Sequence, residues 1–266
     1  MAGLQDITLG RYIALDSAVH HLDPRTKFVA TMTLMLVALS AHSFVPLLLF
    51  AAFLALTTAL SKLPVRLVLA NLRAFVWLFT FTFGLHTFLT PGQVLWTPPF
   101  TSWSITTEGL YAGAFFCLRL STVVVAAALM TLTTAPMQLT AGLERLFSPA
   151  KRIGVPVAEL ALMISIALRF IPVLVDEAER LRKAQISRGA DFTGNPIRRA
   201  RSLIPLLVPL FVAAFERADR LALAMESRCY EPGAERTNYY QLALATRDFV
   251  AASLVLITIA AIYLSR

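Results

Sequence analysis

Two short tripeptides carry the residues of this sequence that are best suited to specific polar recognition. Ser187-Arg188-Gly189 and Ser227-Arg228-Cys229 each follow a charged segment with helical spacing, and turn-forming residues come after both. An arginine offers five donors in a rigid fork that matches a carboxylate. The sequence therefore predicts two helix ends, each presenting an arginine to a binding partner or, as an ordinary solvated helix end, to water.

The two charged segments resemble each other at an offset of 40 residues. The matches are Glu179-Arg180-Leu181 with Asp219-Arg220-Leu221, Ala184 with Ala224, and Ser187-Arg188 with Ser227-Arg228. One interpretation is a docking element present in two copies and offered to two similar partners. The other is a chance match between two arginine-rich helices.

The sequence carries no known catalytic pattern. It lacks the G-x-x-x-x-G-K-[ST] loop that cradles nucleotide phosphates, and it lacks H-E-x-x-H, C-x-x-C and G-x-S-x-G. Its one histidine pair, His20-His21, consists of adjacent residues, which do not face each other on a helix. Cys117 and Cys229 lie in an apolar run and a charged segment, so a disulfide is not expected. We therefore predict no catalytic residue, no metal site and no cofactor.

Composition indicates a membrane protein. Of the 266 residues 57% are hydrophobic and 15% charged, and the mean hydropathy is +0.68, whereas soluble domains are about 45–50% apolar and about 25% charged. The net charge of +8 fits nucleic acid or anionic lipid. The basic residues cluster beside apolar runs, which favours the lipid bilayer and argues against nucleic acid.

Apolar runs long enough to form helices in a bilayer predict about five transmembrane helices, at 28–42, 44–60, 67–89, 109–132 and 248–264. Lys62 and Arg66 lie between the second and third, and Arg11, Arg25 and Lys27 lie before the first, whereas 90–107 has no lysine or arginine. The positive-inside rule places the N-terminus in the cytoplasm and 90–107 outside.

Residues 133–247 then return to the cytoplasm with 16 of the 24 basic and 11 of the 16 acidic residues. Their apolar stretches, Ile153–Leu168 and Leu203–Phe215, are predicted to lie at the inner face, because crossing would put seven cations outside. Separate charged helices are expected at Asp176–Ser187 and Glu216–Arg228. The fold class is all-α integral membrane, with domains 1–132, 133–247 and 248–266.

Rival functions remain open at this point. A multi-pass enzyme acting on lipid phosphates predicts a cluster of acids or histidines near the inner face, but the acids are scattered. A stand-alone secondary transporter predicts polar residues in several spans. Arg119 lies near the middle of the fourth predicted span. It is either a charge on a transport pathway, or it pairs with backbone carbonyls, Glu159 or Asp248.

Three patches carry a family resemblance. They are His21-Leu22-Asp23-Pro24-Arg25-Thr26-Lys27, the stretch from Ala167-Leu168-Arg169-Phe170-Ile171-Pro172 to Ser187-Arg188-Gly189-Ala190-Asp191-Phe192, and the stretch from Ile204-Pro205 to Ser227-Arg228-Cys229-Tyr230. Together they resemble the transmembrane T component of energy-coupling factor (ECF) transporters, the family that includes the cobalt-transport Q subunit. Asp23-Pro24-Arg25 is interpreted as the structural start of the first span.

This resemblance implies partners and a location. A T component joins a pair of ABC-type ATPase subunits to a small membrane-embedded substrate-binding S component, so that ATP hydrolysis comes from the partners. The expected location is a prokaryotic inner or plasma membrane, and the expected cargo a vitamin or transition-metal ion that the sequence does not name.

In that family, Ala-Arg-Gly motifs end two coupling helices and dock into the ATPases. The resemblance maps these motifs onto Ser187-Arg188-Gly189 and Ser227-Arg228-Cys229. Cys229 stands where the pattern has glycine, which puts the second helix cap in question.

Overall fold

The computed structural model describes residues 12–96, 105–192, 195–234 and 243–264. Arg11 and residues 97–104, on which the predicted orientation partly rests, lie outside that part. Helices dominate the fold, as predicted. The elements are α1 (Pro24–Leu39), α2 (Phe44–Leu60), α3 (Val65–Ala74), α4 (Val76–Leu89), β1 (Val94–Trp96), β2 (Ile105–Thr106), α5 (Thr107–Thr133), α6 (Pro136–Leu146), the 3₁₀ helix η2 (Ser148–Ile153), α7 (Val157–Ser187), α8 (Pro196–Glu226) and α9 (Thr246–Leu264).

The chain folds as two compact units. Gly10–Gly142 and Leu242–Arg266 form one, named the membrane unit, and Leu143–Gln241 forms most of the other, named the hairpin unit after α7 and α8. The boundary at Gly142 falls inside α6. The predicted domains 1–132, 133–247 and 248–266 rest on membrane position and stay a prediction.

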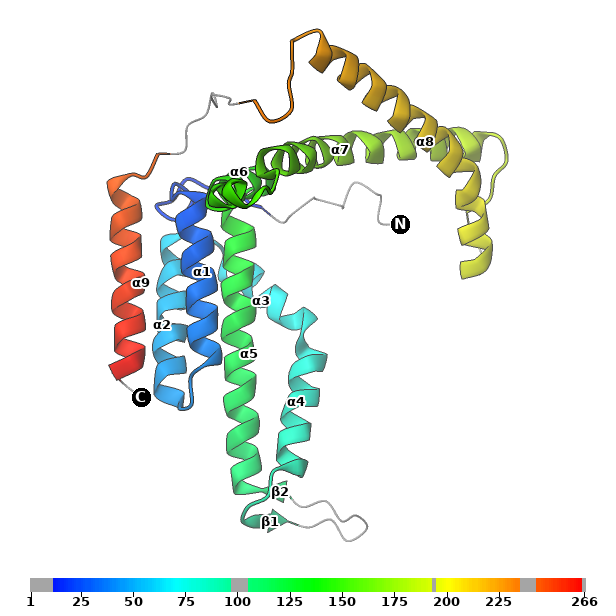
Figure 1. The fold of residues 1–266 in the computed structure, drawn as a ribbon. Helices are drawn as coiled ribbons and strands as arrows, with labels where there is room; N and C mark the ends of the chain where they lie inside the picture. Colours follow the sequence, from blue (N-terminus) through cyan, green and yellow to red (C-terminus); the bar gives the residue numbers. More distant parts are fainter. Residues whose placement is uncertain (1–11, 97–104, 193–194, 235–242, 265–266) are drawn as a thin grey trace. The chain divides into compact units, whose positions relative to one another are not determined.

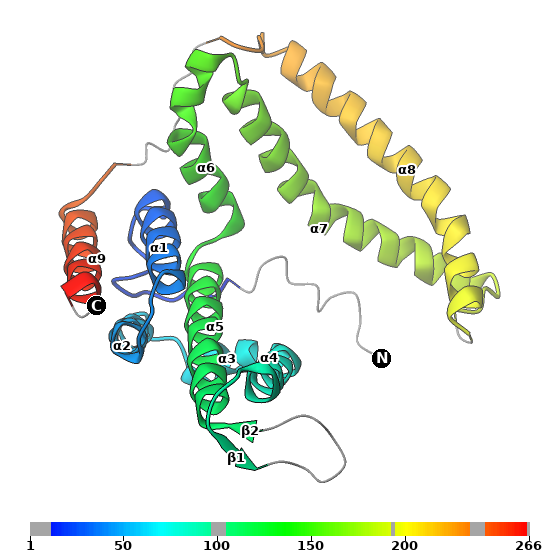
Figure 2. The same cartoon turned by 60° about the horizontal axis from the view of Figure 1, so that its bottom comes forward.

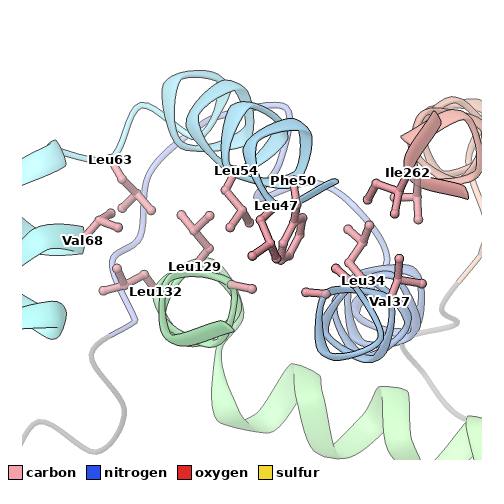
Figure 3. Close-up of a cluster of buried hydrophobic side chains, with 14 of the residues drawn as sticks. Leu34, Val37, Leu47, Phe50, Leu54, Leu63, Val68, Leu129, Leu132 and Ile262 are labelled. Carbon is pink, nitrogen blue, oxygen red and sulfur yellow. The ribbon is translucent and has the colours of Figure 1, made fainter. Parts of the chain in front are cut away.

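Helix α5 is central to the membrane unit. Helices α1, α2, α3 and α4 pack against it, and α9 packs against α1 and α2. Leu34 of α1, Phe50 and Leu54 of α2, Leu129 of α5 and Ile262 of α9 are all buried in the apolar core (Figure 3). The unit is therefore built from helices at both ends of the sequence, with α9 beside α1 and α2 (Figure 1).

The predicted spans fall on helices, but the helices differ in length. By length and composition α5, α7 and α9 can each cross a membrane, as can α3 and α4 if the pair counts as one span. Helices α1 and α2 have 16 and 17 residues, which gives about 24–26 Å against a hydrocarbon core of about 30 Å. Helix α7 contains most of Ile153–Leu168, whose position at the inner face stays a prediction.

The third predicted span, 67–89, is not one continuous helix. It breaks at Phe75 into α3 and α4, which meet at a bend of 59°. The break separates two kinds of surface, because Arg66 and Arg73 both lie on α3 whereas α4 carries no lysine, arginine, aspartate or glutamate. Charges stay at one end of the segment, where water or headgroups can solvate them. After α4 the chain forms the short antiparallel pair β1–β2, which the sequence did not predict.

The expectation of separate apolar and charged helices in 153–228 was wrong. Helices α7 and α8 each run for 31 residues and join an apolar stretch to the charged segment that follows it. Pro172 lies inside α7, and Pro205 and Pro209 lie inside α8. A proline removes one backbone donor and can kink a helix without ending it. No glycine interrupts either helix.

A buried polar cluster holds the start of α1. The Asp23 side chain accepts a hydrogen bond from the Arg25 N–H at 2.9 Å, and Pro24 occupies the first turn, so this tripeptide is a helix start as interpreted from the sequence. The Asp23 N–H donates to Asp248 Oδ1 of α9 at 2.7 Å. Lys27 Nζ donates to the carbonyl oxygens of His20 at 3.1 Å and of Thr133 at 3.0 Å. The cluster ties α1, α5 and α9 together.

Arg119 of α5 has a structural partner. Its Nη2 donates to the carbonyl oxygen of Ala41, and its guanidinium lies 4.6 Å and 5.0 Å from the ring centroids of Phe115 and Phe116. The carbonyl alternative raised by the sequence is therefore the one that the structure contains. Asp248, another partner considered, accepts backbone hydrogen bonds instead.

Candidate docking site

The end of α7 is closed by two backbone hydrogen bonds around Gly189. The Gly189 N–H donates to Ile186 O at 2.9 Å, and the Ala190 N–H donates to Gln185 O at 2.9 Å. Gly189 has φ +86°, a left-handed conformation that suits glycine. This is the Schellman pattern, and it places Arg188 on the final turn.

The end of α8 has the same pattern, although Cys229 replaces the glycine. The Cys229 N–H donates to Glu226 O at 2.9 Å, and the Tyr230 N–H donates to Met225 O at 3.0 Å. Cys229 adopts φ +54°. The doubt that the sequence raised about this cap is thus resolved, because both arginines occupy the same position of the same helix-end turn.

Both arginines are available for contacts. Arg188 and Arg228 are exposed, and neither guanidinium has a hydrogen bond or ion pair with another residue in the described ranges. Three other cations of α7 and α8 are paired with acids on the same helix, namely Arg180 with Glu177, Lys183 with Glu179 and Arg220 with Glu216. The flanking residues Ser187, Gly189, Ser227 and Cys229 are exposed as well.

A cross-helix ion pair joins α7 and α8 away from these ends. Arg217 Nη2 lies 3.0 Å from Glu177 Oε2, and both side chains are largely buried. Arg188 lies 11 residues beyond Glu177, and Arg228 lies 11 residues beyond Arg217, which is about 16 Å along a helix. Beyond the contact the two helices run in roughly opposite directions (Figures 1 and 2). The structure therefore does not bring the two tripeptides, Ser187-Arg188-Gly189 and Ser227-Arg228-Cys229, together in one site.

The sequence reasoning missed this ion pair. Glu177 and Arg217 are separated by 40 residues, the offset of the internal repeat, so the repeat contained the signal. It also missed the hydrogen bond from the Asp23 N–H to the Asp248 carboxylate. No local pattern marks that contact, because the two residues are 225 positions apart.

Within the described ranges the structure contains no group of three or more histidine, cysteine or acidic side chains that could hold a metal ion. His20 Nδ1 lies 2.6 Å from Ser17 Oγ, and His21 Nε2 lies 2.5 Å from Asp16 Oδ1. The two rings thus face different partners.

Comparison with known proteins decides the family. Residues 16–240 match the family described as cobalt transport protein. An energy-coupling factor transporter transmembrane protein of Thermosediminibacter oceani is 45% identical over 249 residues, which cover 93% of each chain. Proteins with the same name from Heliobacterium modesticaldum and Bacillus subtilis are 46% and 38% identical, each over 92% of both chains. The chain belongs to the family of energy-coupling factor transporter transmembrane proteins.

Membership of this energy-coupling family agrees with the architecture. The chain is an all-α bacterial membrane protein and a component of a transporter that works with partner subunits. The match at residues 16–240 includes both tripeptides, so the two capped arginines lie within the part of the chain that the family shares.

Cys229→Gly is expected to stabilise the end of α8. A non-glycine residue pays about 1–2 kcal/mol in the left-handed region, so glycine should raise the local stability by about 1 kcal/mol. Hydrogen exchange of the Ser227–Tyr230 amides measures this as slower exchange, with Arg228 still in place. Gly189→Ala is the matched control. A Cβ at Gly189 meets no atom within 4 Å, so only the backbone conformation should cost stability there. Unchanged exchange in both variants would contradict the argument.

Proposed function

We propose that the chain couples two ABC-type ATPase subunits to a small membrane-embedded S component, for uptake of a vitamin or a transition-metal ion. The observation that carries this proposal is the pair of helix ends with the same cap, each presenting an exposed arginine that has no ion pair among the residues that the structure describes. Two equal contacts suit two similar partners, either a homodimer or a heterodimer. Each guanidinium can form charge-assisted hydrogen bonds with an acidic groove.

The apolar faces of α7 and α8 support the contact with the S component. On α7, Leu160, Met163 and Ile164 are exposed, and on α8 Ile204, Val208, Phe211 and Phe215 are exposed. Contiguous exposed apolar surface of this kind marks a protein or membrane contact. We name the exposed apolar surface of α7 and α8 the platform. We infer that it lies at the cytoplasmic face, within residues 133–247, and that the N-terminus is also cytoplasmic.

The proposal gives the chain no catalytic step of its own. The sequence has no phosphate-binding loop, so the partners hydrolyse ATP. Their closure would draw the two helix ends with it and move the apolar platform that carries the S component. Binding specificity for the cargo belongs to the S component, and lipids surround the membrane unit.

Affinity capture of the tagged full-length chain from its native membrane tests this assignment. We expect two ATPase subunits, or one subunit in double dose, together with a small hydrophobic membrane protein, all identified by mass. The small protein would indicate the cargo. Recovery of the chain alone, with no ATP-dependent uptake in the same cells, would contradict the proposal and favour a transport or lipid-phosphate activity of the isolated chain.

A further inference from the structure

The membrane unit contains a cavity that the coupling function does not use. Its volume is about 440 Å³, and residues of α1, α2, α5 and α9 line it. That volume lies within the range of about 300–1,000 Å³ that ligand pockets occupy. The wall is almost entirely apolar, with Leu34, Phe53, Met130 and Leu254 among its side chains. An apolar cavity offers water few hydrogen-bond partners, so hydrocarbon is its natural occupant.

The cavity is open along two helices. Leu56 and Leu60 of α2 and Val250 and Leu254 of α9 line it, and each is 46–54% exposed. These residues lie on the surface of the membrane unit, where lipid is the surrounding solvent. A flexible chain can therefore enter from the bilayer without opening the packed core.

Cations lie at one end of the cavity. Arg247 lines it and is exposed, and Lys62 follows the end of α2, two residues after the lining residue Leu60. The end of α2 and the start of α9 both line the cavity, through Leu60 and Thr246, so Lys62 and Arg247 lie at the same end of it. The pKa of the Asp16 carboxyl is lowered chiefly by its hydrogen bond with His21 and more weakly by the charges of Lys62 and Arg247, which agrees with this placement.

The other charges at this end have partners. Lys27 Nζ donates to two carbonyl oxygens, and Asp248 accepts hydrogen bonds from the Asp23 N–H at 2.7 Å and the Ala245 N–H at 2.9 Å. Asp16 is bound to His21. Among the described residues at this end, Arg247 and Lys62 are the exposed cations that can face an anion.

We propose that the cavity holds an acyl chain of an anionic phospholipid whose phosphate binds Arg247 and Lys62. The apolar wall matches the hydrocarbon, and the long cationic side chains match the headgroup at the membrane surface. Bidentate hydrogen bonding makes arginine well suited to a phosphate. The site lies wholly in the membrane unit, so the proposal does not depend on docking by Arg188 and Arg228.

Native mass spectrometry of the full-length chain tests the site. The chain, released from detergent micelles, is titrated with phosphatidylglycerol and, separately, with phosphatidylcholine of the same acyl chains. We expect one saturable phosphatidylglycerol per chain. One cation near an anionic headgroup contributes about 1 kcal/mol, a factor of about five in affinity. Arg247→Gln should therefore weaken phosphatidylglycerol binding about fivefold, and adding Lys62→Gln should weaken it about 25-fold.

Two kinds of variant distinguish the contribution of the lipid headgroup from that of the acyl chain. Ala251→Phe and Ala30→Leu fill the cavity from α9 and α1 and should weaken the binding of both lipids. Two such variants are made so that a folding defect in one of them does not decide the test. Arg66→Gln is the matched control, because Arg66 is an exposed cation on α3, outside the lining. Equal affinity for the two lipids, equal effects of Arg247→Gln and Arg66→Gln, or full lipid binding by a folded cavity-filling variant would each overturn the proposal.

Discussion

Uptake should fall at least about 100-fold when Arg188→Glu and Arg228→Glu are combined, and the chain should no longer capture ATPase subunits from the membrane. This result is expected because removing one partner of a buried interfacial charge pair costs about 2–5 kcal/mol, and each 1.4 kcal/mol is tenfold in affinity. Reversal would add repulsion from the acidic groove that the proposed docking assigns to each ATPase subunit. The amount of ATPase recovered per chain, and uptake of the cargo indicated by the captured S component, are the two measurements.

Matched controls for this experiment come from the same helices. Arg180 and Arg220 are also 40 residues apart, with side chains 76% and 70% exposed, and each is paired with an acid on its own helix. Arg180→Glu with Arg220→Glu makes the same change in net charge away from the helix ends. Uptake in this variant should stay close to that of the wild type. Equal losses in the two double variants would show that bulk charge, and not the two ends, matters.

The single reversals refine the test. Both arginines occupy the same position of the same cap, despite Cys229, so each single reversal should weaken ATPase capture to a similar extent. A contact that depends on glycine itself would instead make Arg228→Glu nearly silent. Measuring the two variants side by side distinguishes these cases.

Asp248→Ala should destabilise the membrane unit by about 3–5 kcal/mol. Asp248 is 3% exposed and Lys27 is 7% exposed, and the Asp248 carboxylate stabilises the Lys27 ammonium charge. The substitution leaves a buried cation with less compensation and removes the acceptor of two backbone N–H groups. Unfolding of the purified chain in detergent, followed by heat or denaturant, measures the change.

Two further variants isolate the cause of this loss. Lys27→Met added to Asp248→Ala removes the unbalanced cation and should restore part of the lost stability, giving a coupling energy between the two sites. Ser253→Ala on α9 is the control, because Ser253 is exposed and its hydroxyl donates to the Val250 carbonyl of its own helix. A double variant no more stable than Asp248→Ala alone would show that the charge interaction contributes little.

Composition and short motifs predicted much of this protein. The apolar runs placed the helices of the membrane unit, and the helix ends at Arg188 and Arg228 followed from the change from charged to turn-forming residues. The break at Phe75 could not be predicted in the same way, because 67–89 is largely apolar apart from Arg73 and has no proline or glycine at the break. The continuity of α7 and α8 was missed for the opposite reason: prolines and a change in composition looked like boundaries, yet both helices continue past them.

Contacts between residues that are far apart in the sequence could not be predicted from it. The sequence suggested carbonyls, Glu159 or Asp248 as partners of Arg119, and only packing selects the carbonyl of Ala41. The cap at Cys229 likewise depends on the turn geometry rather than on the residue type that normally occupies it.

The ion pair between Glu177 and Arg217 has a geometric consequence. Glu177 and Arg217 occupy equivalent positions of the 40-residue repeat, so the two copies of the repeat meet at the same position of each helix. Arg188 and Arg228 each follow that contact by 11 residues. Two residues of like charge at such a contact would repel each other, whereas an acid and a base attract. The contact position differs in charge between the two helices, while Leu181 with Leu221, Ala184 with Ala224 and Arg188 with Arg228 repeat unchanged.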